Sequence, residues 1–302
     1  MQTDLSSNVR GALYMVLSMA AFVANDALIK LVLEDVPLFP SILMRGVAAT
    51  LLLTLLAKRK RVLRPNLSGR DWRLVLLRSL AEIGGTLCFL TALAHMPLAN
   101  TMAILQAAPL AVTLAAALIL REQVGWRRYT AIAIGFIGVL IIIQPGSEGF
   151  SLYTLWAVAT VGFIVMRDLV TRQMPTGIPS IFVALTTSVA ITATAGVGTV
   201  FQPVGAVGNG TIIMCAVAAV FIVAAYLFSV EAMRHGEIGF VSPFRYTGLI
   251  WAIILGWLVF EDIPSAPMLV GASIVILTGG YTFYRERAVR KRAAAMRPFA
   301  AS

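Results

Sequence analysis

The chain has 302 residues, of which 59% are hydrophobic and 13% charged, and its formal net charge is +10. With a mean hydropathy of +0.87, this composition excludes a water-soluble domain, because so few polar side chains cannot cover a soluble surface. Long apolar runs without strict alternation favour membrane-spanning helices over a barrel. The sequence therefore predicts an all-α integral membrane protein.

Ten apolar runs are long enough to cross a bilayer, which takes about 20 residues per helix. Prolines and glycines punctuate the connections between them. The predicted transmembrane helices are residues 11–33, 37–57, 73–95, 98–120, 127–144, 151–172, 178–201, 211–233, 238–260 and 265–284.

The basic residues indicate how the chain crosses the membrane. If the N-terminus is cytoplasmic, the cytoplasmic segments hold most of the 24 lysines and arginines, Arg167 and Arg172 included, and the external loops hold none. Because cytoplasmic loops retain basic residues, we expect both termini in the cytoplasm. The positive charge is then explained by contact with anionic lipid headgroups on the cytoplasmic face, and no nucleic-acid partner is expected.

Five weak similarities recur in the same order in the two halves of the chain. Each half holds five predicted helices, and an odd number forces the halves into opposite orientations. Such inverted repeats are the architecture of secondary transporters. The matched positions are Asp26 with Asp168, Lys30 with Arg172, residues 40–42 with 179–181, residues 92–128 with 232–262, and Gly135 and Gly138 with Gly271 and Gly279.

Three stretches resemble a known family: APL, REQ and GFIGVLIIIQPG within residues 108–146, SPFRYT at 242–247, and VGASIVILTGGYTFYRER at 270–287. With the ten-helix plan, they resemble the EamA branch of the drug/metabolite transporter superfamily. The resemblance implies movement of small metabolites through the bacterial inner membrane. It also implies a central cavity lined mainly by the first, third, fourth, sixth, eighth and ninth helices.

The expected organisation follows from this resemblance and from the repeat. We expect a multi-pass protein, monomer or homodimer, that is not an enzyme, binds a small-molecule substrate and needs no cofactor or metal. Its parts are a cytoplasmic N-terminus (1–10), a first EamA repeat (11–144), a second EamA repeat (151–284) and a basic cytoplasmic tail (285–302).

Polar and ionisable side chains within the predicted spans are the candidates for function. A charged group at the bilayer centre costs about 2.5–3.5 kcal/mol on insertion scales, so its presence suggests a role. The substrate-binding candidates are Arg245, Tyr246, Glu82, Gln106, Asn25, Asp26 and Tyr226. The candidates for gating or ion pairing are Arg78, Lys30, Arg45 and Glu231.

Arg245 is the strongest of these candidates, because Pro243 frees backbone beside it and Tyr246 offers an adjacent stacking face. A guanidinium binds a carboxylate or phosphate through two hydrogen bonds. We therefore expect Arg245 to hold an anionic group of the substrate, and Glu82 and Asp26 to bind its cationic part or a proton. This predicts an exporter of an amino acid or organic anion that works by alternating access.

Structural roles stay open for several candidates. Asp26 and Lys30 are four residues apart and could pair with each other, and so could Arg78 and Glu82. Arg45 lies in a helix expected to be peripheral to the cavity, so an interhelical ion pair is its expected role.

Other functions also stay open. A flat aromatic metabolite or vitamin is the alternative substrate, with aromatic side chains such as Tyr226 forming its walls. The alternatives of another class are a membrane-embedded lipid-modifying enzyme and a non-transporting receptor. The enzyme would need a nucleophile or metal constellation, and His95 and His235 match no metal-ligand spacing.

Overall fold

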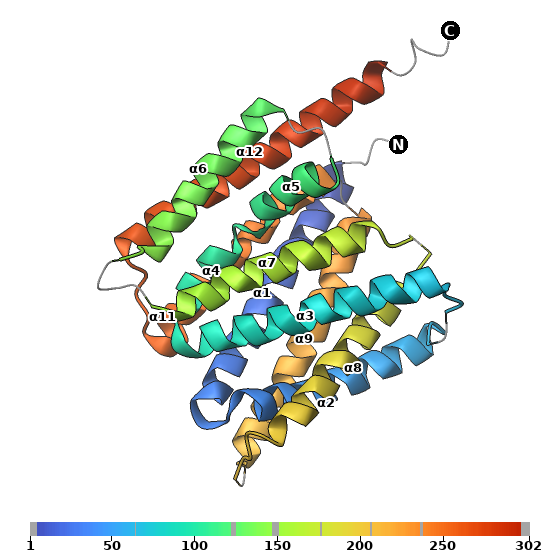
Figure 1. Cartoon of the computed structure of the whole chain (residues 1–302), viewed down its shortest axis with the longest axis vertical. Coiled ribbons are helices and arrows are strands. Elements are labelled where there is room, and N and C mark those ends of the chain that lie inside the picture. The colour runs from blue at the N-terminus through green and yellow to red at the C-terminus, as the bar shows by residue number, and fades with distance from the viewer. Residues whose placement is uncertain are drawn as a thin grey trace.

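The computed structural model describes residues 5–63, 65–121, 125–146, 151–175, 177–205, 207–235 and 238–296, and these residues form helices and connecting turns without a strand. The helices of the first half (Figure 1) are α1 (Leu5–Asp35), α2 (Leu38–Arg59), α3 (Gly69–His95), α4 (Leu98–Leu105), α5 (Ala108–Ile119) and α6 (Trp126–Ile143). Those of the second half are α7 (Tyr153–Arg172), α8 (Ser180–Thr199), α9 (Asn209–His235), α10 (Ile238–Val241), the 3₁₀ helix η1 (Ser242–Tyr246), α11 (Thr247–Phe260) and α12 (Ala266–Met296).

Within the described residues, ten helical segments are long and apolar enough to cross a membrane. They follow the order of the ten predicted runs, which confirms the predicted number of spans. Two runs differ from the continuous helices that we predicted. Residues 98–120 divide into α4 and α5, and residues 238–260 divide into α10, η1 and α11.

Proline explains both interruptions. Pro109 stands at the start of α5, and Pro243 stands at the start of η1. A proline has no backbone N–H to donate, and its ring clashes with the carbonyl four residues earlier. Each of these spans therefore changes its backbone conformation partway across, at matching places in the two halves.

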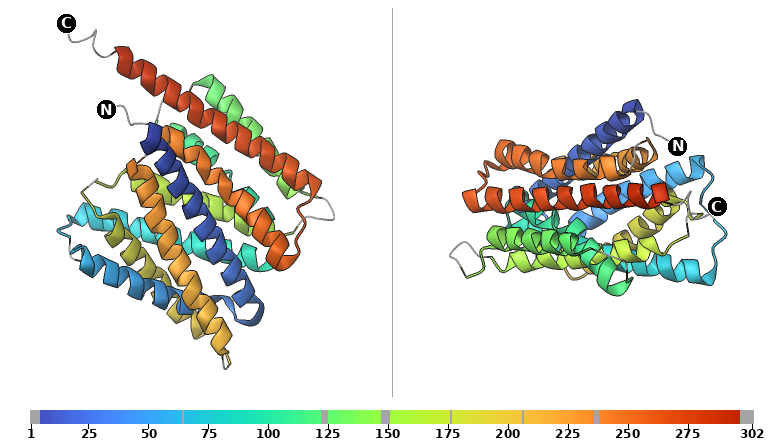
Figure 2. Two further views of the ribbon diagram at one scale, coloured as in Figure 1. Left: turned by 180° about the vertical axis from the view of Figure 1, so that it is seen from behind. Right: turned by 90° about the horizontal axis from the view of Figure 1, so that it is seen from above.

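The helices pack chiefly in pairs that join one half of the chain to the other. The most extensive contacts join α1 to α9, α3 to α7, α6 to α12 and α2 to α8. α6 and α12 lie side by side in both views of Figure 2, and in the left view they follow one edge of the bundle. The halves are thus interleaved rather than packed as separate bodies.

The pairing of α6 with α12 depends on glycine. A Cβ atom added to Gly138 would lie 2.8 Å from the carbonyl oxygen of Gly271, and one added to Gly271 would collide with the carbonyl oxygen of Gly138. The two backbones are therefore in direct contact, the kind of approach that small residues allow between transmembrane helices. This contact uses two of the glycines that align in the internal repeat.

We expect Gly138→Ala to lower the free energy of unfolding by about 1–3 kcal/mol, because the added methyl forces the two helices apart. Thermal unfolding of the purified protein in detergent measures the change. Gly280→Ala is the matched control, since nothing lies within 4 Å of the Cβ position of Gly280. Equal melting temperatures for the two variants would contradict the backbone contact.

Candidate functional site

A cavity of about 760 Å³ enters the bundle between α2, α3, α8 and α9. Lys60, Thr171 and Glu231 lie at the end where α2, α7 and α9 finish, and Arg45 lies 15 residues before Lys60 on α2. At 1.5 Å per residue, Arg45 is about 22 Å of helix away from that end. The cavity therefore runs from one end of the bundle deep into it.

The helices that line this cavity differ from those that we expected. The expectation left out the second and seventh helices, which are α2 and α8, yet both form walls of the cavity. Close packing explains the difference, because a Cβ added to Gly46 on α2 would collide with Oγ1 of Thr192 on α8, so the two helices together form a continuous wall of the cavity. Arg45 consequently lines the cavity, whereas the sequence suggested a peripheral position for it.

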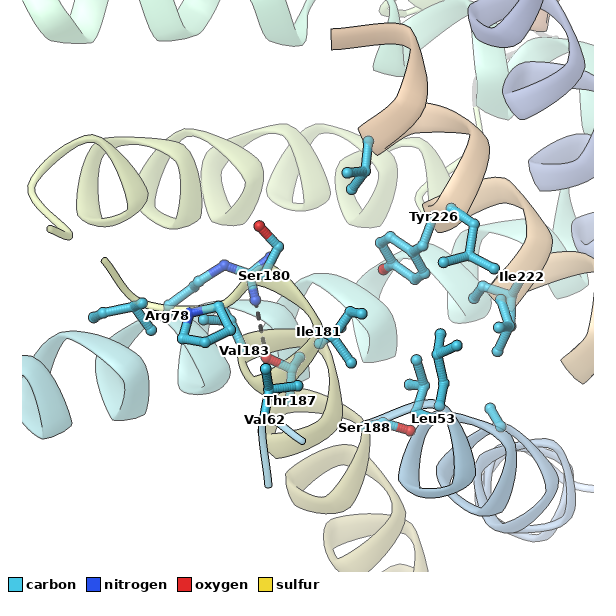
Figure 3. A pocket seen from close by; sticks show the side chains of 18 of the residues that line it. Leu53, Val62, Arg78, Ser180, Ile181, Val183, Thr187, Ser188, Ile222 and Tyr226 are labelled. Carbon is cyan, nitrogen blue, oxygen red and sulfur yellow. Dashed lines mark hydrogen bonds between the residues drawn. The ribbon is translucent and has the colours of Figure 1, made fainter. Parts of the chain in front are cut away.

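Arg78 lies in the cavity wall and binds partners on two helices (Figure 3). Its Nη1 donates a hydrogen bond of 2.9 Å to Oγ1 of Thr187 on α8. Its Nη2 lies 3.9 Å from Oε2 of Glu82, one turn along α3. The pairing of Arg78 with Glu82, which their spacing suggested, is thus present as a long contact.

Arg167 is the main correction to the sequence analysis. We placed it among the cytoplasmic residues, but its side chain lies within the bundle and binds two carboxylates. Nε donates a hydrogen bond of 2.9 Å to Oδ1 of Asp168, and Nη1 lies 3.4 Å from Oε1 of Glu82 on α3. Glu82 therefore faces two guanidinium groups. Its negative charge is balanced by arginines of the protein, whereas the sequence analysis expected it to bind a cationic part of the substrate or a proton.

One signal in the sequence pointed to this segment. Asp168 aligns with Asp26 in the internal repeat, which marked it as a counterpart of a candidate residue. The alignment could not show that Arg167 reaches Glu82, because that contact joins residues 85 positions apart.

Asn25 links Asp26, another of the predicted site residues, to Arg45. Arg45 Nη1 donates to Oδ1 of Asn25 at 3.5 Å, and Nδ2 of Asn25 donates to Oδ1 of Asp26 at 2.8 Å. All three side chains are buried. The suggested pair between Asp26 and Lys30 is wrong, because each of these residues has other partners.

Lys30 holds together the helix ends remote from the mouth of the cavity. Its Nζ donates to the carbonyl oxygens of Leu93 at 3.1 Å and of Met96 at 2.6 Å, and it lies 5.2 Å from the centre of the Phe260 ring. Carbonyl groups at the end of a helix have no partner within the helix, and a cation near them is stabilising. Lys30 therefore ties α1 to the end of α3 and to α11.

Tyr226 lies where the charged residues meet. Its ring projects from α9 into the cavity (Figure 3) and packs edge-on against Phe22, with 5.3 Å between the ring centres. Its hydroxyl interacts electrostatically with Glu82, Arg167, Arg78 and Arg45. We call these four residues, together with Asp26, which interacts with Arg45, and with Asp168 and Arg245, which interact with Arg167, the intramembrane charge cluster.

Arg245, Tyr246 and Gln106 lie together but outside the walls of this cavity. Nε2 of Gln106 donates to the carbonyl oxygen of Tyr246 at 3.2 Å, which joins the α4–α5 break to η1. The Tyr246 ring is buried, and its hydroxyl packs directly against Gly279 without a hydrogen-bond partner. Tyr246 therefore does not offer the stacking face that we expected beside Arg245.

Arg245 itself is exposed and interacts electrostatically with Asp168. Glu231, the last candidate, lies at the mouth of the cavity, where Oε2 is 3.5 Å from Nδ1 of His235. The structure thus brings Arg45, Arg78, Glu82 and Tyr226 together and leaves Glu231 near the entrance.

Comparison with known proteins gives a matching family profile and a similar fold. The profile of the EamA-like transporter family matches residues 9–144. A solved crystal structure superposes with a TM-score of 0.63 at 16% identity, covering 93% of this chain and 99% of the other. At that identity the similarity supports the fold alone.

Three relatives are named as transporters. The chain is 28% identical to the riboflavin transporter of Vibrio cholerae, over 67% of this chain and 68% of the relative. It is 26% identical to the pseudopaline exporter CntI of Pseudomonas aeruginosa, over 88% and 93%. It is 24% identical to the S-adenosylmethionine uptake transporter of Rickettsia conorii, over 72% and 74%.

These relatives are transporters rather than enzymes, and they move chemically different small metabolites. The ten apolar helices agree with a protein that crosses the membrane repeatedly. Together, the profile match over residues 9–144 and the relatives show that this chain is similar to EamA-like transporters of the drug/metabolite type, and it is a multi-pass protein of the bacterial inner membrane.

Proposed function

We propose that this protein is a secondary transporter, and not an enzyme, that exports an amino acid or small organic anion across the inner membrane by alternating access. The observation that carries the proposal is the cavity, which enters the bundle from one end and reaches Arg45, Arg78 and Tyr226 inside it. Its volume of about 760 Å³ lies within the range of sites that hold small molecules.

The pairing of helices supports an inverted repeat. Exchanging the first five spans with the second five converts the contact of α1 with α9 into that of α7 with α3, and both contacts are present. The same exchange returns the α2–α8 and α6–α12 pairs to themselves. A two-fold axis lying in the membrane plane produces this pattern, and transporters with inverted repeats work by moving one repeat against the other.

The cavity position supports an inward-open state with cytoplasmic termini. In Figures 1 and 2, the start of α1, the turn from α2 to α3 and the end of α12 lie towards the same side of the bundle. The cavity opens on that side, beside Lys60. Basic residues favour the cytoplasm, and the contacts of Lys30 close the other side.

The broken spans support a binding site near the middle of the bilayer. Interrupted helices in secondary transporters free backbone groups that contact substrates and ions. Here the α4–α5 break and η1 come from opposite halves and meet through Gln106 and Tyr246. A site between the halves is the place where alternating access requires the substrate to bind.

A flat aromatic metabolite or vitamin is the second candidate substrate. Tyr226 and Phe22 form an edge-on pair beside the cavity, and one relative is named as a riboflavin transporter. Both substrates need Tyr226, but only the anionic one needs excess positive charge in the cavity.

Flux in proteoliposomes tests the function. Vesicles with the purified protein, preloaded with one unlabelled amino acid or organic anion at a time, are expected to accumulate the same labelled solute faster than protein-free vesicles. Tyr226→Ala should lower that flux about fivefold or more, because an aromatic contact contributes roughly 1 kcal/mol. Tyr281→Ala is the matched control, since Tyr281 is exposed on α12; a panel in which no solute exceeds the protein-free rate would reject the transporter.

Thiol labelling tests whether the cavity is filled with water and opens to the cytoplasm. The experiment uses a variant in which both native cysteines, Cys88 and Cys215, are replaced. A cysteine replacing Ser188, which lines the cavity, should react with a membrane-impermeant methanethiosulfonate reagent in inside-out vesicles. A cysteine replacing Val189 should stay unreactive, because Val189 is exposed on the outer surface of an apolar span and faces lipid. Equal reaction at both positions would contradict a water-filled cavity that opens to the cytoplasm.

A double-mutant cycle tests whether the ion pair between Glu82 and Arg167 stabilises the protein. We expect Glu82→Gln and Arg167→Gln to show a coupling of about 1–3 kcal/mol in the free energy of unfolding, because each change leaves its partner without a counter-charge. Unfolding in mixed micelles measures it. The half-exposed pair of Glu231 and His235 is the control and should couple by less than about 1 kcal/mol. A coupling near zero for the first pair would leave Glu82 available to bind substrate.

A further inference from the structure

Arg45 combines three features that no other described arginine of the intramembrane charge cluster combines. Its side chain is 8% exposed, it lies within an apolar span, and it contributes to the cavity wall. Arg78 also lines the cavity but binds Thr187 and contacts Glu82, while Arg167 binds Glu82 and Asp168. Arg245 lies outside the cavity wall.

The immediate partner of Arg45 is a neutral amide. Its Nη1 reaches Oδ1 of Asn25 at 3.5 Å, the long limit of a hydrogen bond. Asn25 turns its amide nitrogen towards Asp26, so the carboxylate binds Asn25 rather than Arg45. No ion pair of Arg45 occurs among the residues that the structure describes.

The guanidinium of Arg45 has few hydrogen-bond acceptors. Asp26 is a nearby opposite charge, but the side-chain hydrogen bond that Arg45 makes among the described residues is the long one to Asn25. A buried ion is stable only when an opposite charge and hydrogen bonds replace its lost water. A guanidinium has five N–H donors and suits a carboxylate or phosphate. One anionic group in the cavity beside Arg45 would supply the missing hydrogen-bond acceptors and a second opposite charge.

We propose that Arg45 is the residue that binds the anionic group of the transported solute, as a carboxylate or phosphate, at the inner end of the cavity. The hydroxyl of Tyr226 lies nearby, and Leu53, Ile181 and Ile222 give the neighbouring wall an apolar character. The cargo is accordingly a small organic anion with an apolar portion. This inference rests on the proposed transport function and transfers the anion-binding role from Arg245 to Arg45.

The local charge can be measured without knowing the cargo. In the Ser188→Cys protein without native thiols, the reaction rate of anionic 2-sulfonatoethyl methanethiosulfonate is divided by that of its cationic trimethylammonium analogue. We expect Arg45→Gln to lower this ratio at least tenfold, because one charge is removed from a site of low dielectric constant. Arg45→Lys should retain most of the ratio.

Asn25→Asp provides a second test that keeps the side-chain volume and does not remove the arginine. It places a carboxylate within 3.5 Å of Arg45 and should also lower the ratio. Arg73→Gln is the control, because Arg73 is exposed at the start of α3 and outside the cavity wall; it should leave the ratio unchanged. If neither Arg45→Gln nor Asn25→Asp lowers the ratio, the proposal is overturned.

The same vesicles separate this inference from the transport function. For a solute that the wild-type protein moves, Arg45→Gln should abolish flux of the anion, and Arg45→Lys should restore part of it. A ratio that depends on Arg45 without flux of any solute would support the anion site and reject transport. Flux of an anion that survives Arg45→Gln unchanged would overturn the role of Arg45 and leave transport intact.

Membrane composition identifies the source of the anion. A phosphate at this site could belong to a lipid headgroup instead of a soluble cargo. The reactivity ratio at Ser188→Cys is therefore compared with that of the Arg45→Gln variant, which cancels the effect of the membrane surface potential, in vesicles of phosphatidylcholine alone and in vesicles that also contain phosphatidylglycerol. A ratio that is equal in both supports a soluble cargo, whereas a ratio that falls to the Arg45→Gln value with phosphatidylglycerol assigns the site to lipid and overturns the cargo.

Discussion

Charge inside a medium of low dielectric constant constrains this molecule more than any other factor. Each guanidinium and carboxylate within the apolar bundle must meet an opposite charge or a set of hydrogen bonds, or the helix that carries it could not stay in place. Glu82 shows the effect, because it contacts an arginine of its own helix and another from α7. The α3–α7 contact therefore has an electrostatic core, and α1 and α2 meet through Asn25 and Arg45.

The same constraint links the two halves of the chain. The α3–α7 ion pair and the Gln106 contact with η1 both join residues of the first half to residues of the second. A protein that changes the side on which its cavity opens must keep these groups solvated throughout. In the proposed transport cycle, the anionic group that we propose for Arg45 enters and leaves with the solute.

The sequence predicted the ten spans and the pairing of Arg78 with Glu82, because hydrophobic runs and helical spacing are local properties. It could not predict that Arg167 reaches Glu82, since that contact depends on how two distant helices pack. It also misjudged Tyr246, whose hydroxyl packs against Gly279, and Arg45, whose helix lines the cavity. The search for charged residues within the spans identified relevant side chains, but the packing of the helices determines which of them line the cavity.

The glycine contact between α6 and α12 also bears on how the bundle can move. Backbone atoms touch there, so no flexible side chain is available to repack when these helices shift. Between α2 and α8, by contrast, the hydroxyl of Thr50 lies 2.8 Å from that of Ser188 and 3.3 Å from that of Thr192. These hydroxyls sit on rotatable side chains one turn apart on α8, so the contact between the two helices is made partly by side chains. The bundle thus has one edge where backbones touch and one where hydroxyl groups also meet across the helices, and the cavity lies beside the second.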